Sequence, residues 1–302
     1  MRVLVTGATG FVGRRLLPKL DRPVVLSRDA ARAEKSLAQF QVKAFAWDPD
    51  RPPPAEAFDG IEAVIHLAGD PVAEGRWTEA KKARIRESRV AGTRNLVATL
   101  RAIGGGPKVL VSASAVGIYG DRGDEQLDEQ SKPANDFLAE VCQSWEHEAL
   151  EAASLGIRVA TVRVGIVLGE KGGALGKMLT PFYLGMGSPL GSGDQYMPWV
   201  HIDDLVGIFL HAAKHDQVQG ALNGVAPNPV TNREFTKTLG RAIGRWTFMP
   251  PVPGFVLRTM LGEFGDVLLT SQRVYPVATK QAGFVYQYPE LEPALRQILH
   301  RS

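Results

Sequence analysis

The sequence has little cysteine and no long apolar run. Cys142 is the only cysteine among 302 residues, which excludes a disulfide within the chain and suits a reducing compartment. No apolar stretch approaches the ~20 residues that a membrane-spanning helix needs. The first predicted strand starts at residue 2, so we expect no signal or transit peptide before it. We therefore expect a cytoplasmic protein with no membrane partner.

A strong charge of either sign is also absent. The 35 basic and 32 acidic residues leave a net charge of +3, and no dense basic run is interleaved with aromatic residues. This balance argues against nucleic acid as a partner. His211 and His215 stand four residues apart on an expected helix, but they lack an accompanying acidic motif, so we expect no metal site. The chain also shows no internal repeat and no low-complexity segment.

Three regularly spaced glycines follow the first apolar run. Residues 2–5 predict a strand buried on both faces, and residues 14–20 predict a helix. A glycine turn between a strand and a helix is the context of a dinucleotide-binding fingerprint, in which a pyrophosphate lies at the helix N-terminus. The candidate cofactor residues of this turn are Gly7, Gly10, Phe11, Val12 and Gly13. The alternative is an ordinary glycine-rich turn without a ligand.

A hydroxyl and a guanidinium follow the second predicted strand, at residues 23–26. In folds with this fingerprint, an acid after that strand selects NAD, whereas a nearby arginine accommodates the 2′-phosphate of NADP. Here Ser27 and Arg28 occupy the position, with Arg32 one turn later, and guanidinium groups bind phosphate through charge-assisted hydrogen bonds. The nearest acid, Asp29, comes one place late for the NAD role. The sequence favours NADP(H), the alternative being that Arg28 is a solvated loop residue.

Strands and helices alternate over the first half of the chain, which is long enough for one large domain or two smaller ones. Further strands are predicted at 41–47, 62–67, 108–113 and 158–168, and helices at 78–103 and after Asp136. This alternation predicts an α/β fold with a Rossmann-type, doubly wound parallel sheet. We expect residues 1–168 to form an NADP-binding Rossmann domain, its sheet completed by segments near 196–224. Residues 169–302 are expected to form a smaller, mostly helical substrate region interleaved with the first, with helices at 203–214, 232–243, 255–261 and 291–299.

Small residues end the fourth predicted strand. Ala68 and Gly69 would leave room for a ligand at the carboxyl edge of the sheet, which is where open α/β sheets bind one. His66, two residues earlier, is interpreted as a core histidine, because a lone histidine in a buried strand is more often a satisfied core residue than a ligand.

Four segments together resemble the extended short-chain dehydrogenase/reductases. They are Thr6–Gly13, Val64–Gly69, Ser112–Gly120 and Trp199–Asp204. More narrowly, the chain resembles the atypical epimerase-family branch, which is similar to the plant giant-chloroplast division factor. The stretches that carry this closer resemblance are Gly191–Trp199, Leu222–Asn232, Ser271–Pro276 and Gly283–Tyr286. The resemblance covers nearly the whole chain and implies a Rossmann domain that holds NAD or NADP, with a smaller C-terminal part closing over the substrate.

The resemblance also implies roles for single residues. Ser114 occupies the position of the serine that polarises the substrate in relatives. Extended relatives usually carry an Asn before Val-x-Gly-Thr in the long helix, and here Arg89 replaces it. Further implied cofactor contacts are Arg84 and Arg89 at the dinucleotide phosphates, Leu67 and Ala68 on the adenosine side, and Val167 near the nicotinamide.

The Tyr-x-x-x-Lys pair, which supplies the proton in relatives, is missing. None of the six tyrosines has a lysine four residues later, and the stretch 137–146, where the pair belongs, contains neither residue. A neighbouring lysine would lower the pKa of a tyrosine and make it usable near neutral pH. Glu140 or Cys142 could act instead, the alternatives being a solvent-facing glutamate and a core-facing cysteine on an amphipathic helix. Ser114 and Tyr119 are the candidate catalytic residues.

Residues beyond the fifth strand complete a candidate substrate pocket. Besides the two candidate catalytic residues, its members are Arg163, Gln195, Trp199 and His201. Trp199 and His201 fall at alternate positions, so they share a face in an extended segment. Extended relatives often form dimers through two long helices, which makes the helix at 78–103 a candidate homodimer surface.

Two functions fit these observations. The first is an NADP(H)-dependent oxidoreductase or epimerase of a small polar or nucleotide-linked substrate, supported by a complete cofactor half-site and Ser114. The second is a non-catalytic NADP(H)-binding sensor or scaffold linked to cell division. The missing Tyr-x-x-x-Lys pair supports the second, because losing a general acid–base group normally costs ~100-fold or more in rate.

Overall fold

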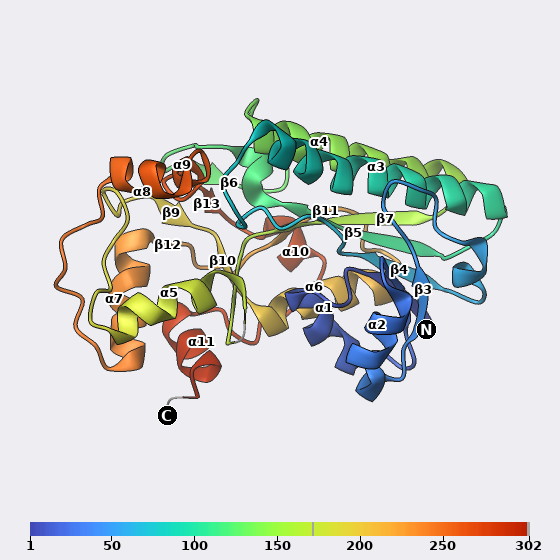
Figure 1. The fold of residues 1–302 in the computed structure, drawn as a ribbon, viewed down its shortest axis with the longest axis horizontal. Coiled ribbons are helices and arrows are strands. Elements are labelled where there is room, and N and C mark those ends of the chain that lie inside the picture. Colours follow the sequence, from blue (N-terminus) through green and yellow to red (C-terminus); the bar gives the residue numbers. More distant parts are fainter. Residues whose placement is uncertain (171, 301–302) are drawn as a thin grey trace.

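A seven-stranded parallel sheet runs through the computed structural model, which describes residues 1–170 and 172–300 (Figure 1). The strand order is β11-β7-β5-β4-β1-β2-β3, so the direction of winding reverses between β4 and β1. The inner strands are short and mostly buried, as a sheet covered on both faces requires, whereas the edge strand Lys43–Ala46 is exposed or half-buried. Their bounds are β1 Val3–Thr6, β2 Val24–Ser27, β3 Lys43–Ala46, β4 Ala63–His66, β5 Val109–Ala115, β7 Arg158–Val164 and β11 Gly220–Gly224.

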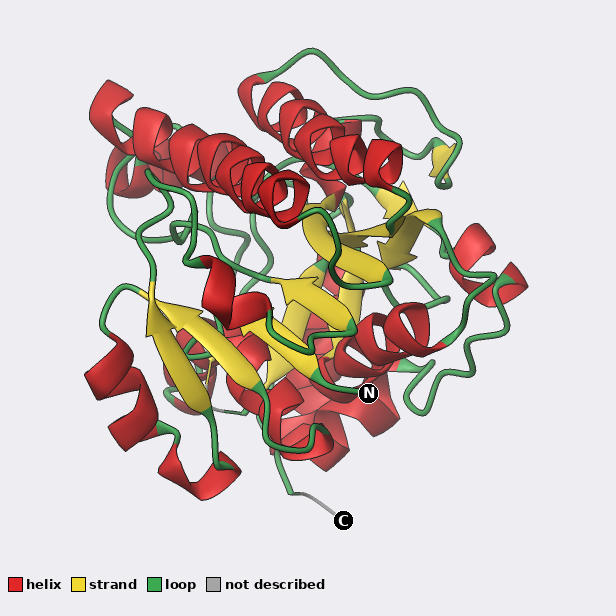
Figure 2. Cartoon of the chain, turned by 90° about the vertical axis from the view of Figure 1, so that its right-hand side faces the viewer, coloured by secondary structure: helices red, strands yellow, loops and turns green. Residues whose placement is uncertain are grey.

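Helices cover both faces of this sheet (Figure 2). One face packs against α3 (Glu79–Ile103) and α4 (Phe137–Leu150), through a core that includes Leu96, Leu110 and Ala149. The other face packs against α1 (Phe11–Leu16), α2 (Ala30–Ser36) and α6 (Ile202–Lys214). Short 3-10 turns lie at Leu17–Lys19, Ala38–Phe40, Ala55–Phe58, Val116–Tyr119 and Glu151–Leu155. The predicted fold class, an α/β Rossmann-type doubly wound sheet, is confirmed.

The long helix α3 begins and ends where its local signals predict. The hydroxyl of Thr78 accepts a hydrogen bond from the backbone N–H of Lys81, which caps the first turn. Gly104 ends the helix with a φ of 63°, a left-handed conformation that glycine adopts without steric cost. Ile85 and Leu100 are buried on one side, as their spacing predicts.

Two expected boundaries in the Rossmann part are wrong. The first helix begins at Phe11 rather than at residue 14, so the third glycine of the turn lies inside it. The strand expected at 158–168 breaks at Gly165, because the next backbone N–H, of Ile166, donates to the carbonyl oxygen of Pro198 at 2.7 Å instead of continuing the main sheet. Only glycine fits at the break, since a Cβ on Gly165 would lie 2.2 Å from that oxygen. Beyond the break, β8 (Ile166–Gly169) leaves the main sheet and pairs in parallel with β10 (Trp199–His201).

The segments near 196–224 complete the sheet only in part. β11 joins its edge beside β7, whereas β9 (Tyr196–Met197) pairs with β12 (Val230–Thr231) in a separate small sheet. The C-terminal region is mostly helical and packs around its own core, which contains Phe182, Trp199 and Phe235. Its helices are α5 Gly173–Tyr183, α7 Asn232–Ile243, α8 Gly254–Leu261, α9 Phe264–Val267 and α11 Leu291–Ile298. The sequence did not predict α5.

The tail of the chain returns to the main sheet. β13 (Arg273–Val274) pairs in parallel with β6 (Gln126–Leu127), and α10 (Val277–Gln281) packs beside the edge strand β11 (Figure 1). This return interleaves the C-terminal region with the Rossmann part. No helix in residues 1–170 and 172–300 has the length and apolar character to cross a bilayer.

Candidate functional site

The glycine turn after β1 has the shape that a close ligand contact requires. Gly7 adopts a φ of 67°, and a Cβ on it would lie 2.8 Å from the carbonyl of Leu67. A Cβ on Gly13 would lie 2.5 Å from the carbonyl oxygen of Gly7, so only glycine lets α1 approach the turn this closely. Gly10 is the N-cap residue of α1, and no side chain caps its first turn. The backbone therefore presents free N–H groups at the carboxyl edge of the sheet.

Thr6 joins this turn to the loop that follows β4. Its hydroxyl oxygen accepts hydrogen bonds from the backbone N–H groups of Leu67 (3.1 Å) and Ala68 (3.0 Å). The hydroxyl proton is left for Nδ1 of His66 at 2.7 Å, and Nε2 of that ring contacts the hydroxyl of Thr93 at 3.0 Å. Burial lowers the pKa of His66 to about 4. The interpretation of His66 as a satisfied core histidine is confirmed.

Side chains from one side of α3 hold the loop after Ala68. Lys81 donates to the carboxylate of Asp70 at 2.5 Å, and Ser88 accepts from the backbone N–H of Asp70 at 2.9 Å. Arg89 donates to the backbone oxygen of Asp70 at 3.0 Å. The sequence did not predict a role for Asp70, Lys81 or Ser88. The spacing of residues 81, 88 and 89 places them near one side of a helix. That spacing alone does not show that the loop after Ala68 lies beside this side.

The two arginines predicted at the dinucleotide phosphates differ in their surroundings. The guanidinium of Arg89 lies against Gly69, whose Cβ would come within 3.0 Å of it, and stacks 5.2 Å over the ring of Trp145. Burial lowers the pKa of Arg89. Arg84 is exposed and lies three residues after Lys81 and four before Ser88, so it shares the loop-facing side of α3. The contact of both with phosphate stays a prediction.

The end of β2 presents Ser27 and Arg28 as the sequence suggests. The hydroxyl of Ser27 donates to the backbone oxygen of Asp29 at 3.2 Å. The Asp29 carboxylate accepts from the backbone N–H of Arg32 at 2.9 Å and so caps α2. Arg28 is exposed and has no ion pair within the described residues. A guanidinium is therefore free beside this strand end, while the nearest carboxylate is already bonded.

Phe11 brings the end of β8 to the glycine turn. Cβ atoms on Gly169 and Gly172 would lie 2.6 Å and 2.5 Å from its ring, so these glycines leave the space that the ring fills. Val167 on β8 is half-buried, as is Val12 beside Phe11. The structure thus places the segment of Val167 next to the turn, as the predicted nicotinamide contact requires.

Ser114 lies near the end of β5, at the same carboxyl edge. Only 2% of the residue is exposed, yet its hydroxyl has no hydrogen-bond partner among the described residues. Buried hydroxyl groups are normally bonded, so this one is an exception that a bound ligand would explain. The turn that follows packs against α4, where a Cβ on Gly117 would lie 3.3 Å from the Leu138 side chain. An apolar side chain therefore occupies the part of α4 closest to this turn.

Tyr119 is held below the surface. It is fully buried, and its hydroxyl bonds to the Asn223 side chain at 2.7 Å and accepts from Arg163 at 3.0 Å. Burial raises the pKa of Tyr119 to about 12. Arg163 in turn forms a bidentate ion pair with Glu146 at 2.8 and 2.9 Å. Burial acts to lower the pKa of Arg163, but the hydrogen bond and charge of Glu146 raise it overall.

The other two proton-transfer candidates, Cys142 and Glu140, lie on α4 as a core-facing cysteine and a solvent-facing glutamate. Cys142 is buried, and burial raises the pKa of its thiol to about 12, so it is protonated at neutral pH. Glu140 is exposed and pairs with Arg86 at 3.2 Å. The thiol of Cys142 is therefore unsuited to acid–base work near pH 7, and the Glu140 carboxylate is held in a surface ion pair.

The remaining predicted substrate residues have their polar atoms bonded inside the protein. Gln195 donates to the backbone oxygen of Leu190 at 3.0 Å, and the indole N–H of Trp199 donates to that of Asn228 at 3.1 Å. His201 caps α6 through the N–H of Asp203 and bonds to Gln297. All three predicted residues are buried. The structure gives each a structural partner, and their contact with a substrate stays a prediction.

A half-buried aromatic cluster borders the edge beside α4. The ring of Trp77, from the loop before α3, lies 5.5 Å from Phe137 at the start of α4 and 5.9 Å from Phe264 in α9. Lys82 of α3 forms an ion pair at 2.5 Å with Glu263, the residue before α9. The loop, α4 and α9 therefore meet beside the turn that follows Ser114.

Glu129 ties the tail to the edge strand. Its carboxylate accepts from the backbone N–H groups of Asn223 (2.9 Å) and Ala278 (2.9 Å), so it bridges β11 and the start of α10. The hydroxyl of Thr279 donates to the backbone oxygen of Asn223 at 3.0 Å. Both free backbone groups of Asn223 are therefore bonded to side chains.

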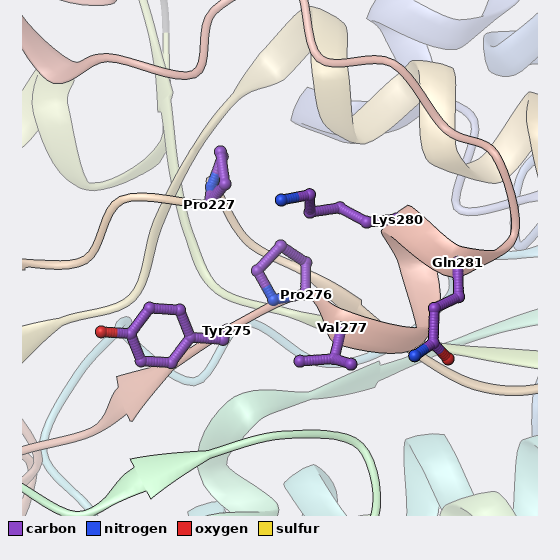
Figure 3. A pocket seen from close by; sticks show the side chains of 6 residues that line it. All are labelled: Pro227, Tyr275, Pro276, Val277, Lys280 and Gln281. Carbon is purple, nitrogen blue, oxygen red and sulfur yellow. The ribbon is translucent and has the colours of Figure 1, made fainter.

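A small pocket of about 270 Å³ opens on the outer side of α10 (Figure 3). Tyr275, Pro276 and Pro227 form its walls, and the Lys280 side chain extends across it. None of its lining residues belongs to the glycine turn or to the loops after β2 and β4. It lies apart from the predicted cofactor site.

Comparisons with known proteins agree with this architecture. The model of the NAD dependent epimerase/dehydratase family matches residues 3–223, and a domain of unknown function (DUF1731) matches residues 252–298. The chloroplastic homolog of epimerase family protein SDR39U1 from Arabidopsis thaliana is 41% identical, over 99% of this chain and 87% of its own length.

Solved structures extend the likeness. The crystal structure of human epimerase family protein SDR39U1 with NADPH has a TM-score of 0.88 and 36% identity, with 100% of both chains covered. UDP-glucuronic acid 4-epimerase from Bacillus cereus shares the fold, with a TM-score of 0.78 and 16% identity over 99% of this chain and 98% of its own. The chain therefore belongs to the NAD dependent epimerase/dehydratase family, in the branch of the SDR39U1-like epimerase family proteins that its motifs predicted.

Proposed function

We propose that this chain binds NADP(H) along the carboxyl edge of β1, β2 and β4 and uses it in an oxidoreductase or epimerase reaction. The substrate would be a small polar or nucleotide-linked molecule. NADP(H) is supported by the human relative, which was solved with NADPH, and by the Ser27–Arg28 pair at the end of β2. The lone buried thiol, Cys142, favours the cytoplasm as the site of action.

The residues present fit the cofactor. The glycine turn leaves space and free N–H groups for the pyrophosphate. Arg28 would bind the 2′-phosphate through charge-assisted hydrogen bonds, with the Ser27 hydroxyl beside it. Thr6 and Arg89 fix the loop 67–70 from two sides, so that its small residues form a rigid wall along the cofactor. Arg84 would add a second cation above the phosphates.

The observation that carries a catalytic role is the unpartnered hydroxyl of Ser114. Bound NADP(H) would supply or accept a hydride at this edge. The Ser114 hydroxyl would donate a hydrogen bond to the substrate oxygen on the carbon that exchanges the hydride, which stabilises negative charge on that oxygen. The partner that Ser114 lacks inside the protein would then be the substrate.

A specific observation also favours the second candidate function, a non-catalytic NADP(H)-binding sensor or scaffold. Leu138 packs beside the turn that follows Ser114, and the pKa values of Tyr119 and Cys142 are both raised to about 12. The thiol of Cys142 and the phenol of Tyr119 therefore both keep their protons at neutral pH, and an apolar side chain occupies the part of α4 beside this turn. A chain of this kind could still bind NADP(H) and report its occupancy.

One experiment separates the two functions. The purified chain is mixed with NADPH and a cell metabolite extract, and the absorbance of the reduced cofactor is followed, with a product screen for redox-neutral epimerisation. A catalytic protein loses activity in Ser114→Ala and keeps it in the matched control Ser112→Ala, whose hydroxyl bonds within β5. NADPH binding without turnover or product would overturn the enzymatic proposal and support the sensor.

A further inference from the structure

The chain segments 183–186 and 246–260 lie at the end of the molecule farthest from β3 (Figure 1), and they expose large apolar side chains. Eight of the twelve exposed large hydrophobic side chains in residues 1–170 and 172–300 lie in these two segments. We call this group the apolar end face. Its members are Tyr183, Leu184, Met186, Trp246, Phe248, Met249, Phe255 and Met260.

The two segments are neighbours in space. The stretch after the first segment runs beside the stretch before α8, because Leu190 forms a parallel bridge with Val252 and Ser188 donates to the backbone oxygen of Pro250. Trp246 and Phe248 stack on each other, with ring centroids 5.4 Å apart and planes 9° from parallel. Stacking holds both rings outward, 78% and 80% exposed.

Summed over both segments, the exposed apolar area is large for an isolated chain. Phe255 and Met260 are 68% and 67% exposed. At the usual areas of such side chains, the eight residues expose on the order of 1,000 Å². The largest apolar patch of a typical monomer is roughly 300–600 Å². A standard protein–protein interface buries about 800 Å² on each partner.

The charges at the rim allow a like copy to bind. Three arginines from the elements around the face form ion pairs inside the chain, Arg233 with Asp194, Arg258 with Asp266, and Arg241 with Glu292, which Arg296 shares. These ion pairs reduce the repulsion between like charges when two copies of the face meet. Arg245 has no ion pair within the described residues, so it leaves one unmatched cation beside Trp246.

The surface of α3, the helix expected to form a dimer, is charged rather than apolar. Ion pairs join α3 to α4 and to the turn after it, Arg94 to Glu148 at 2.5 Å and Arg101 to Glu151 at 3.6 Å. Arg84 and Arg86 are exposed on the same helix. Interface cores are depleted of charged residues and enriched in aromatic residues and Met. The apolar end face has this composition and α3 does not.

We infer that the apolar end face is the surface through which two copies of this chain associate. The contact is isologous, with the stacked Trp246 and Phe248 of each copy at its centre. Because the Arg245 side chains of the two copies repel each other, added salt strengthens the dimer, which also suits a contact dominated by apolar area.

Sedimentation velocity of the full chain over a range of concentrations tests this inference. The wild type is expected to be dimeric, and Trp246→Asp to raise the dimer dissociation constant at least ~30-fold, the effect of a hot-spot residue. The matched control, Ala98→Asp, places the same charge on the exposed side of α3 and leaves the dimer intact. Circular dichroism and NADPH binding confirm that both variants are folded.

Three results would each overturn the inference. One is a wild type that stays monomeric up to its solubility limit. Another is a dimer that survives both Trp246→Asp and Phe248→Asp. The third is a dimer that Ala98→Asp dissociates, which would place the contact on α3 as the sequence analysis expected.

Discussion

The ammonium group of Lys81 lies 2.5 Å from the carboxylate of Asp70, and only 6% of Lys81 is exposed. Asp70 follows the small residues Ala68 and Gly69 in the loop after β4, and Arg89 and Ser88 bond to its backbone. The long helix thus fixes the loop through one buried ion pair and two backbone contacts. The position of the loop depends on α3.

Replacing Lys81 by Met is expected to destabilise the chain, because it leaves the Asp70 carboxylate partly buried without a partner. Asp70 keeps some exposure, so the free energy of unfolding should fall by about 1–3 kcal/mol rather than by the larger cost of a fully buried charge. Urea unfolding measures this change. Lys82→Met, one position along the same helix, should cost much less, and Lys81→Met/Asp70→Asn should recover part of the loss. Equal stability of Lys81→Met and wild type would refute the expectation.

The stability of the chain is expected to fall in mild acid because of His66. The pKa of this residue is 6.5 in the unfolded chain and about 4 in the folded one, since burial disfavours the charged ring. The unfolded state therefore binds the proton first, and stability is complete above pH ~6.5 and decreases as the pH falls towards 4. The shift corresponds to on the order of 3 kcal/mol.

Urea unfolding between pH 7.5 and about pH 4 checks this pH dependence. His66→Asn should be less stable at neutral pH and should lack the steep part of the profile. His147→Asn removes an exposed histidine from α4 and should keep the profile of the wild type. An identical profile in His66→Asn would show that other groups control the acid transition.

Tyr119→Phe distinguishes a positioning role from proton transfer. The hydroxyl is buried between Asn223 and Arg163, so its loss should lower the free energy of unfolding by about 1–2 kcal/mol. If the protein turns over substrate, the rate should change by less than tenfold, because a phenol with a pKa of about 12 gives up no proton near pH 7. A loss of ~100-fold in kcat with unchanged stability would instead establish Tyr119 as the proton donor.

Arg28→Ala is expected to weaken NADPH binding ~10- to 100-fold and to leave NADH binding unchanged, because only NADPH carries the 2′-phosphate. Isothermal titration with both cofactors measures the preference. Arg22→Ala, at the opposite end of β2, is the matched control and should affect neither cofactor. An unchanged preference in Arg28→Ala would assign the phosphate to another group.

Local signals made the fold and half of the site predictable. The glycine turn, the N-cap Thr78 and the helix-ending Gly104 each determine the structure of the few residues around them, so they can be recognised in the sequence. The break at Gly165 could not be predicted, because its cause is the carbonyl of Pro198, which only the folded chain brings close.

The polar residues of the site were harder to predict for the same reason. Arg163 and His201 are residue types that often bind ligands. Their side chains, however, already form hydrogen bonds with Glu146 and Gln297, which lie on other elements. Residue type and spacing predict which groups lie at the carboxyl edge. They do not predict which of those groups are already bonded within the protein.

The bonds of Glu129 and Thr279 to Asn223 have a consequence for the integrity of the sheet. An edge strand with free backbone groups is a template on which another chain can add a strand. β11 is an edge strand of the main sheet. The two side chains occupy the N–H and the carbonyl that an added strand would use. A chain that ends before α10 should lose the Thr279 contact and aggregate through β11, which light scattering would detect. If it does, the tail has a second role besides completing the fold, which is to keep the edge strand from pairing with another copy.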